Sequence, residues 1–157
     1  MSGDGAPALA VTAHGAKVAI VASSWHTAIM GGLVAGAKKT CEAAGAQYEL
    51  FEVAGSFELA LIAQECARSG FDAVVALGVI IRGGTPHFEY VCQAATDALN
   101  HVSLNTAVPL GFGLLTVDTE QQGLDRAGLP ESREDKGREA TEAALLSLQL
   151  LRELRSR

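Results

Sequence analysis

Short apolar segments alternate with longer amphipathic ones along this chain, and this alternation limits its fold more than any other feature. The apolar segments predict strands over Lys17 to Ala22, Gln47 to Val53, Asp72 to Ile81 and Val108 to Val117. The other segments predict helices over about Thr27 to Ala44, Phe57 to Arg68, Pro86 to Val102, Glu120 to Ala127 and Glu134 to Arg155. Mostly apolar strands that are joined by helices favour a parallel sheet covered on both faces.

Residues that commonly end or begin helices fall at the boundaries of these segments. Gly45, Gly70 and Gly128 stand where helix C-caps are expected, and Thr119 and Ser132 stand where N-caps are expected. The strand and helix pattern therefore agrees with the punctuation between its elements. We predict a three-layer α/β/α sandwich with a four-stranded, parallel, flavodoxin-like sheet.

Length and composition indicate one domain. The chain has 157 residues, of which 48% are apolar, and this is enough to form a single core. Residues 1–16 are rich in alanine and glycine and do not resemble a secretory signal. We expect a flexible N-terminal arm over residues 1–16 and one domain over residues 17–157. The last predicted helix has a wide apolar face, which favours contacts between subunits.

Charge and cysteine content argue against several classes of function. The net charge is −6, so a general affinity for nucleic acid or for an anionic membrane surface is not expected. No apolar run is long enough to span a membrane. Cys41, Cys66 and Cys92 are far apart in the sequence, which argues against a disulfide framework and a metal site. We interpret them as buried, reduced thiols of a cytoplasmic protein.

The predicted sheet selects four loops as candidate site loops, because ligands bind at the carboxyl ends of parallel strands in such folds. These loops are Ser23 to His26, Ala54 to Glu58, Arg82 to His87 and Thr116 to Glu120. Together they contain no serine–histidine–acid order and no metal-ligand spacing. Nothing in the fourth loop is obviously reactive.

The third loop contains the clearest motif, GGTPHFEYV over residues 83–91. Its glycines expose backbone N–H groups, and Pro86 suits the first position of a helix. Free N–H groups at the start of a helix, together with the helix dipole, can bind a phosphate. His87 lies in the same turn as a candidate for proton transfer. Taken alone, the motif also fits a glycine-rich turn with a surface histidine.

Several other residues fit a structural role as well as a functional one. Trp25, the only tryptophan, can stack on a planar ring or pack on the sheet. Glu58 begins a helix, where a capping role is favoured over ligand binding when the residue is considered in isolation. Arg126 and Lys136 look like ordinary solvated or capping charges, and His26 looks incidental at a helix start.

Four segments, considered together, carry a family resemblance. The strongest is GVIIRGGTPHFEYV (78–91), and it is supported by AGSFELAL (54–61), GFGLLTVDTEQQGLDRAG (111–128) and DKGREATEAAL (135–145). These segments resemble the 6,7-dimethyl-8-ribityllumazine synthase family over the chain from about Lys17 to Arg155. The resemblance is highly specific because all four occur in order and at family-like spacing.

The resemblance implies a transferase of riboflavin biosynthesis that uses neither a metal nor an organic cofactor. It condenses 5-amino-6-(D-ribitylamino)uracil with 3,4-dihydroxy-2-butanone 4-phosphate and releases phosphate and water. An amine attacks a ketone, the imine loses phosphate and the ring closes, so the reaction needs positioning, phosphate binding and proton transfer. The alternative is a non-catalytic flavin- or lumazine-binding scaffold of the same fold. A phosphate-binding regulator is a weaker alternative that leaves Glu58 and Arg126 unexplained.

Site residues are also implied by the resemblance, position by position. Trp25 stacks on the pyrimidine, Glu58 holds ribityl hydroxyls and His87 transfers a proton. The other substrate-binding positions are Ser56, Phe57, Val79, Ile80, Gly84, Thr85, Phe112, Arg126 and Lys136. Among these, Gly84, Thr85 and Arg126 bind the phosphate, while Phe112, Arg126 and Lys136 reach the site from a neighbouring subunit.

Members of the family form pentamers or sixty-subunit capsids, so the resemblance implies a homo-oligomer with shared active sites. Here the connection from Ala127 to Asp135 is longer than in capsid-forming members and contains Pro130 without the usual Gly-Asn-Lys-Gly kink. These features favour a free homopentamer. The chain also has Ala54-Gly55-Ser56 where Pro-Gly-Ala is usual, and Trp25-His26 where Phe-Asn is commoner.

Overall fold

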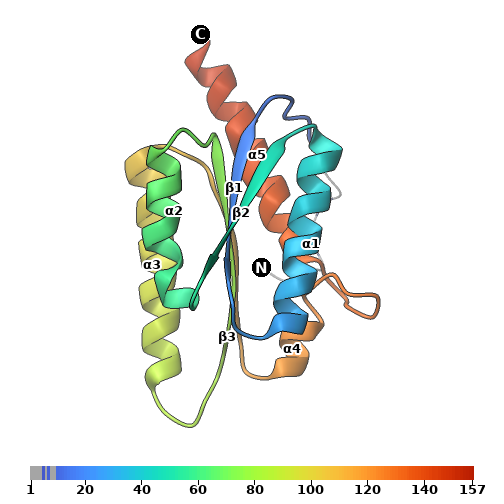
Figure 1. Cartoon of the computed structure of the whole chain (residues 1–157), viewed down its shortest axis with the longest axis vertical. Coiled ribbons are helices and arrows are strands. Elements are labelled where there is room, and N and C mark those ends of the chain that lie inside the picture. The colour runs from blue at the N-terminus through green and yellow to red at the C-terminus, as the bar shows by residue number, and fades with distance from the viewer. Residues whose placement is uncertain (1–4, 6, 8–9) are drawn as a thin grey trace.

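The computed structural model describes residues 5, 7 and 10–157 and has three layers (Figure 1). Within these residues, four parallel strands form one sheet in the order β2-β1-β3-β4. The strands are β1 (Lys17–Ser23), β2 (Gln47–Val53), β3 (Ala73–Ile81) and β4 (Leu110–Val117). Helical crossovers join them, as parallel neighbours require. The predicted α/β/α sandwich with a flavodoxin-like sheet is confirmed.

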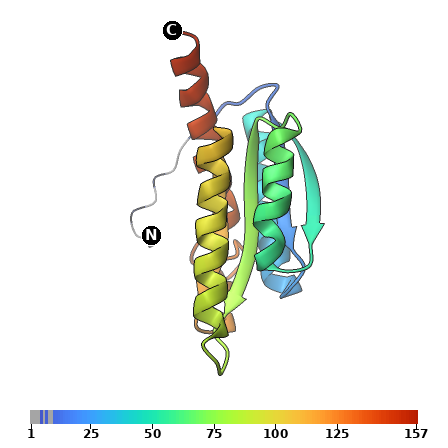
Figure 2. The same cartoon turned by 90° about the vertical axis from the view of Figure 1, so that its left-hand side faces the viewer.

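Helices cover both faces of the sheet (Figures 1 and 2). One face carries α1 (Thr27–Ala44), α5 (Lys136–Arg155) and the short α4 (Glu120–Leu124). The other face carries α3 (His87–Thr106) beside α2 (Leu59–Arg68), which follows a 3-10 turn, η2 (Ser56–Glu58). Successive strand residues face opposite sides, so each face has its own apolar core.

The register of the sheet brings three strand ends to one edge. Ser23 of β1 lies opposite Val53 of β2, and Ala22 lies opposite Leu77 of β3. The loops that follow β1 and β2 therefore leave the sheet side by side, and β3 continues from Leu77 to Ile81 before its loop leaves at the same edge. This edge carries the site described below.

Two predicted caps are confirmed. Gly45 ends α1 in the left-handed conformation with φ 75°, which glycine adopts at little cost. The side chain of Thr119 accepts a hydrogen bond from the N–H of Gln122 and so caps α4.

The predicted N-cap at Ser132 is wrong. Asp135 caps α5 instead, because its carboxylate accepts a hydrogen bond from the N–H of Arg138 at 3.0 Å. The hydroxyl of Ser132 accepts from the N–H of Leu129 at 2.9 Å and donates to the carbonyl of Leu124. Both residue types are good N-caps, so the sequence alone did not separate a helix cap from a loop closure.

The predicted arm over residues 1–16 falls partly on residues 1–4, 6 and 8–9, which lie outside the described residues. In the described part, the N–H of Ala13 donates to the carbonyl of Ala44 at 2.8 Å. Ala13 and Ala16 are both buried. Packing against the apolar core on the α1 and α5 face therefore begins before Lys17. The domain limits of 17–157 stay a prediction.

All three cysteines are free thiols, and Cys41 and Cys66 are buried as predicted. Burial was wrong for Cys92, which is half-buried on α3. Among the described residues, no helix combines the length and the apolar character that crossing a membrane requires.

Candidate active site

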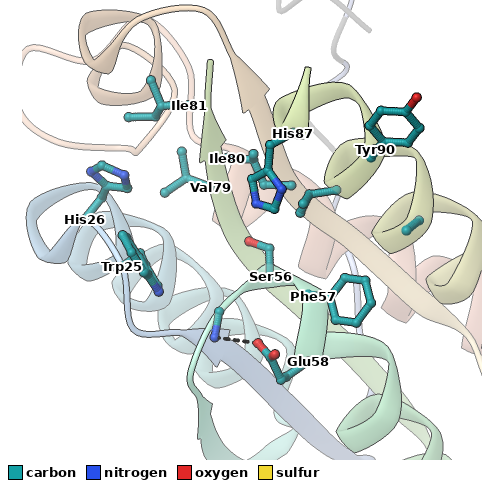
Figure 3. A pocket seen from close by; sticks show the side chains of 13 residues that line it. Trp25, His26, Ser56, Phe57, Glu58, Val79, Ile80, Ile81, His87 and Tyr90 are labelled. Carbon is teal, nitrogen blue, oxygen red and sulfur yellow. Dashed lines mark hydrogen bonds between the residues drawn. The ribbon is translucent and has the colours of Figure 1, made fainter. Parts of the chain in front are cut away.

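An open, mostly apolar pocket lies where β1, β2 and β3 end, beneath the start of α3 (Figure 3). It is lined by Trp25, His26, Gly55, Ser56, Phe57, Glu58, Val79, Ile80, Ile81, His87, Tyr90, Val91 and Ala94. Three of the four predicted site loops contribute to it. No lysine or arginine is among the lining residues in the described part of the chain.

The loop after β1 supplies the aromatic wall of the pocket. Trp25 is 66% exposed, so its indole is not part of the core. The preceding Ser24 donates its hydroxyl to the carbonyl of Val53 at 2.8 Å and thereby ties the end of β1 to the end of β2. A Cβ placed on Gly55 would lie 3.5 Å from Nε1 of Trp25, so the indole lies close to the second loop. An exposed ring at this edge can stack on a planar ligand.

The turn after β2 supplies a carboxylate. Oε2 of Glu58 accepts a hydrogen bond from the N–H of Gly55 at 3.0 Å, so the capping role favoured from the sequence is present. Its Oε1 has no hydrogen bond among the described residues. Ser56 is buried, with its hydroxyl against Gly78 of β3, whereas Phe57 is 65% exposed. One carboxylate oxygen is therefore left to accept hydrogen bonds from a ligand.

The start of α3 supplies a histidine. Pro86 has helical dihedral angles (φ −62°, ψ −7°) but directly precedes α3, so it lies one position before the first helical position predicted for it. His87 is the first residue of α3, and its ring points toward Ser56 and the pocket interior (Figure 3). No hydrogen bond to this ring occurs within the described residues. The imidazole can thus exchange a proton with a molecule bound in the pocket.

The turn that precedes this histidine is exposed and lies just outside the pocket lining. Neither Gly83 nor Gly84 has a positive φ, and a Cβ on either glycine would meet open space. The fold of the protomer therefore does not require glycine at these two positions. Gly84 and Thr85, both predicted to bind phosphate, sit beside the pocket rather than in its wall.

An arginine that sequence reasoning did not single out as a site residue braces this turn. Arg82 Nε donates to Asp118 at 2.7 Å, and its NH1 donates to Glu89 at 3.2 Å. The guanidinium also lies over the ring of Phe88, 4.4 Å from the ring centroid. Hydrogen bonds to the two carboxylates raise the pKa of Arg82. One side chain thus joins the end of β3, the loop after β4 and the first turn of α3.

Arg126 and Lys136 are brought together, but away from this pocket. The N–H of Lys136 donates to the carbonyl of Arg126 at 2.9 Å, within a hairpin that pairs residues 125–128 with residues 133–136. The hairpin packs on the α1 and α5 face, through Ala127 and Leu129, and is the orange loop in Figure 1. The pocket lies instead at the carboxyl ends of the strands, between the loop that precedes α1 and the first turns of α3.

The ammonium of Lys136 is held between two carboxylates. It lies 2.9 Å from Glu134 and 2.7 Å from Glu139, and each of the three side chains is less than 20% exposed. Burial alone would lower the pKa of Lys136, but the hydrogen bonds to Glu139 and Glu134 outweigh it and raise the pKa. Arg126 is freer, because its described hydrogen bond runs from NH1 to the carbonyl of Gln122 at 2.8 Å.

Comparison with known proteins identifies the family to which the chain belongs. The family described as 6,7-dimethyl-8-ribityllumazine synthase matches residues 15–152. The chain belongs to this family. Proteins of the same name from Leifsonia xyli and Clavibacter sepedonicus are 59% and 57% identical to it, each over 99% of both chains. The one from Paenarthrobacter aurescens is 59% identical over 98% of this chain and 99% of its own length.

The lumazine synthase resemblance seen in the sequence is therefore confirmed. The chain is an enzyme, a transferase of riboflavin biosynthesis, rather than the non-catalytic scaffold that was the alternative. Lumazine synthases act on small molecules and are oligomeric, so the protomer is one part of a larger assembly.

Within this lumazine synthase protomer, the predicted site residues separate into groups. Seven lie together in the pocket: Trp25, Ser56, Phe57, Glu58, Val79, Ile80 and His87. Arg126 and Lys136 form a second group on the hairpin. Phe112 stands apart on the edge strand β4, opposite Ala76, with 48% of its surface exposed. Gly84 and Thr85 lie beside the pocket, whereas the three residues expected to serve a neighbouring subunit lie elsewhere on the protomer.

Sequence reasoning missed six lining residues: His26, Gly55, Ile81, Tyr90, Val91 and Ala94. A signal for three of them was available. Tyr90, Val91 and Ala94 lie three, four and seven positions after His87, so they share its helix face. Once His87 had been chosen, helical periodicity predicted the rest of this wall.

Proposed function

We propose that the pocket is the active site in which this lumazine synthase joins its two substrates. The convergence of Trp25, Glu58 and His87 on one open pocket is the observation that supports this assignment most strongly. These residues offer a flat apolar face, a hydrogen-bond acceptor and a proton carrier. The condensation of 5-amino-6-(D-ribitylamino)uracil with 3,4-dihydroxy-2-butanone 4-phosphate needs all three.

In this proposal the aminopyrimidine lies on the indole of Trp25. Backbone groups of Ser56 and Phe57 contact the ring, and side chains of Val79 and Ile80 line its other edge. The ribityl chain extends toward Glu58, whose Oε1 has no hydrogen bond among the described residues while Oε2 is fixed by the N–H of Gly55. A carboxylate that is held in place by one oxygen loses little freedom when the other binds hydroxyl groups.

The phosphate of the second substrate lies at the turn that precedes α3. Gly84 and Thr85 offer backbone N–H groups and a hydroxyl at the start of a 20-residue helix. The pocket has no cation of its own in the described residues, so the balancing charge comes from Arg126 of a neighbouring protomer. Phe112 and Lys136 of that neighbour complete the wall. The support for this arrangement is that all three lie outside the protomer's own pocket.

His87 carries the proton in our proposal. The amine of the pyrimidine attacks the ketone carbon, and a first water leaves as the imine forms. Phosphate is then eliminated, and the second nitrogen attacks the carbonyl group that this elimination leaves, so that a second water is released as the ring closes. His87 takes up and returns protons during these steps. Because both reactants are intrinsically reactive once positioned, His87→Ala retains partial activity.

For the assembly we propose a free homopentamer with shared sites rather than a sixty-subunit capsid. The connection from Ala127 to Asp135 is folded back on itself: the two end residues are bridged, and Gly128 is left-handed with φ 68°. We further propose that residues 17–157 form one catalytic domain, that no cofactor is needed, and that the enzyme acts in the cytoplasm.

An intersubunit complementation experiment tests the shared site. One variant carries Arg126→Ala, and a second carries both Trp25→Ala and His87→Ala. Each alone has low activity in the lumazine-forming assay, measured against the uncatalysed reaction. Co-assembled oligomers recover activity, because some sites pair an intact pocket with an intact Arg126. If the mixture is no more active than its parts, the site is not shared in this way.

A further inference from the structure

His26 has a backbone conformation that the start of a helix does not require. Its φ is 59° and its ψ is 69°, which is left-handed, and it directly precedes α1. In the described residues, Ala107 is the only other non-glycine residue with a positive φ, and it ends a helix, where this conformation is common. N-cap residues normally have extended dihedral angles, and their side chains bond to the helix N–H groups.

Capping does not explain this conformation. The side chain of His26 makes no capping hydrogen bond, and its carbonyl accepts the N–H of Met30 at 2.9 Å, as an extended residue could also do. A histidine held in a sparsely populated region next to a pocket is the kind of outlier from which a functional hypothesis is drawn. The location of its side chain supplies the second observation.

The left-handed conformation brings the imidazole of His26 to the pocket wall. Its ring centroid is 6.5 Å from that of Trp25, with an angle of 45° between the ring planes. Figure 3 shows both rings on the α1 side of the pocket, with Val79 between His26 and His87. The ring is half-buried, and neither of its nitrogens has a hydrogen bond among the described residues. A neutral imidazole offers one donor and one acceptor, so polar capacity is present on an otherwise apolar wall.

We propose that His26 is a further substrate-binding residue, whose imidazole hydrogen-bonds the ribitylaminopyrimidine. The proposal rests on the proposed function, because it takes the pyrimidine to be stacked on Trp25. The bond is directed to this substrate and not to the phosphorylated ketone, since the phosphate turn at residues 83–85 adjoins the opposite wall, formed by α3. The left-handed backbone is retained because it aims the ring at the ligand.

Three substitutions separate the side chain from the backbone. His26→Gly removes the ring and adopts positive φ freely, and His26→Asn keeps hydrogen-bonding atoms and also tolerates this conformation. His26→Ala removes the ring and keeps the backbone strain. His101→Asn, at an exposed position of α3, controls for the loss of a histidine elsewhere.

We expect His26→Gly to raise KM for the ribitylaminouracil by about three- to tenfold, the equivalent of one lost hydrogen bond. KM for the butanone phosphate and kcat should change by less than about twofold, because the proposed hydrogen bond is made to the other substrate. His26→Asn should recover most of the loss. Quenching of the single tryptophan by ribitylaminouracil gives Kd values for the same variants without turnover.

Equal increases in both KM values, an unchanged KM and Kd in His26→Gly, or failure of His26→Asn to recover binding would each overturn the proposal. Melting temperatures are measured in parallel, and His26→Gly should melt at or above the parent because it relieves the backbone. Trp25→Ala separates a failure of this proposal from a failure of the proposed function, and its Kd is measured by isothermal titration calorimetry because the variant contains no tryptophan. If it leaves Kd for ribitylaminouracil unchanged, the stacking in the proposed function is wrong, whatever His26 does.

Discussion

Three glycines near the end of β3 are subject to different constraints at the scale of single residues. A Cβ on Gly78 would lie 2.8 Å from the hydroxyl of Ser56 and 3.0 Å from side chains of Leu59 and Leu114. Gly78 is thus required by packing. Gly83 and Gly84 have neither close neighbours nor positive φ, so a requirement for glycine there would have to come from outside the protomer.

Gly84→Ala should therefore fold normally but bind the phosphorylated ketone less well. A methyl group at the turn would keep the phosphate from approaching the backbone N–H groups, and loss of one such hydrogen bond corresponds to about a three- to tenfold rise in KM. Steady-state kinetics with varied butanone phosphate measure this change.

Gly78→Ala is the matched control, with the opposite expected pattern. Overpacking beside Ser56 should lower the free energy of unfolding by about 1–3 kcal/mol, as seen by urea denaturation. If Gly84→Ala lost as much stability as Gly78→Ala, or kept the parent KM, the phosphate would not lie at this turn.

Cys41 gives a prediction for alkaline pH. Burial, assisted by the nearby Glu42 carboxylate, raises the pKa of Cys41 from 9.0 to about 11. The folded state thus retains a proton that the unfolded state loses, so the associated stability is complete below pH 9.0 and disappears as pH rises through about 11. Two pKa units correspond to about 3 kcal/mol at most.

Urea denaturation from about pH 8 to about pH 11 should therefore show falling stability, and Cys41→Ala should reduce the fall. Tyr48→Phe is examined in parallel, because the hydrogen bond to Glu42 raises the pKa of Tyr48 and acts in the same direction. An equal decline in the parent and in Cys41→Ala would assign the alkaline loss to other groups.

At the scale of elements, the hairpin that joins α4 to α5 carries two arginines. Arg126 is the one proposed to bind phosphate, and Arg133 serves as its matched control. The side chain of Arg126 has a single described hydrogen bond, to the carbonyl of Gln122, and Arg133 is exposed on the paired segment of the same hairpin. The backbone of Arg133 donates to the carbonyl of Asp125 at 2.8 Å. Both substitutions to alanine leave this backbone pairing intact.

Arg126→Ala should raise KM for the butanone phosphate by about 10- to 150-fold, because charge-assisted hydrogen bonds contribute about 1.5–3 kcal/mol. Arg133→Ala should leave KM within about twofold of the parent, as expected for an exposed charge without a ligand. KM for the ribitylaminouracil is the second measurement. Equal effects of the two substitutions would remove Arg126 from the phosphate site.

The sequence predicted most elements well, and the exceptions have physical causes. The observed limits of α1 (Thr27–Ala44) and β2 (Gln47–Val53) are those predicted, because the left-handed Gly45 separates a clear helix pattern from a clear strand pattern. The helix predicted to end at Val102 continues to Thr106, since nothing between them prevents helix formation. Ser132 was misassigned because the choice between it and Asp135 depends on how the hairpin closes, which is a tertiary property.

At the scale of the whole molecule, the oligomer is measurable directly. Light scattering at neutral pH should give a molar mass five times the 16.3 kDa of one chain. The closed hairpin from Ala127 to Asp135 is the reason for expecting free pentamers. Particles of megadalton mass would indicate a capsid and overturn this prediction.

The site was predictable in part: residues that meet at the strand ends of one chain could be predicted, whereas those that depend on tertiary structure could not. Seven of the predicted residues line one pocket, because strand ends and helix periodicity determine which side chains meet within a chain. His26 was missed because its role depends on a left-handed backbone that no residue pattern marks. Lys136 looked like an ordinary charge because its carboxylate partners are recognisable only after folding.

If the site is shared as proposed, each molecule supplies Arg126 to the pocket of one neighbour and receives the Arg126 of the other neighbour in its own pocket. In an open row of such molecules, the first would hold a pocket that no arginine closes, and the last would extend its arginine into water. Only a closed ring of subunits leaves every pocket completed and every Arg126 in use. Loss of a single member would then silence two pockets, its own and the one it had been completing.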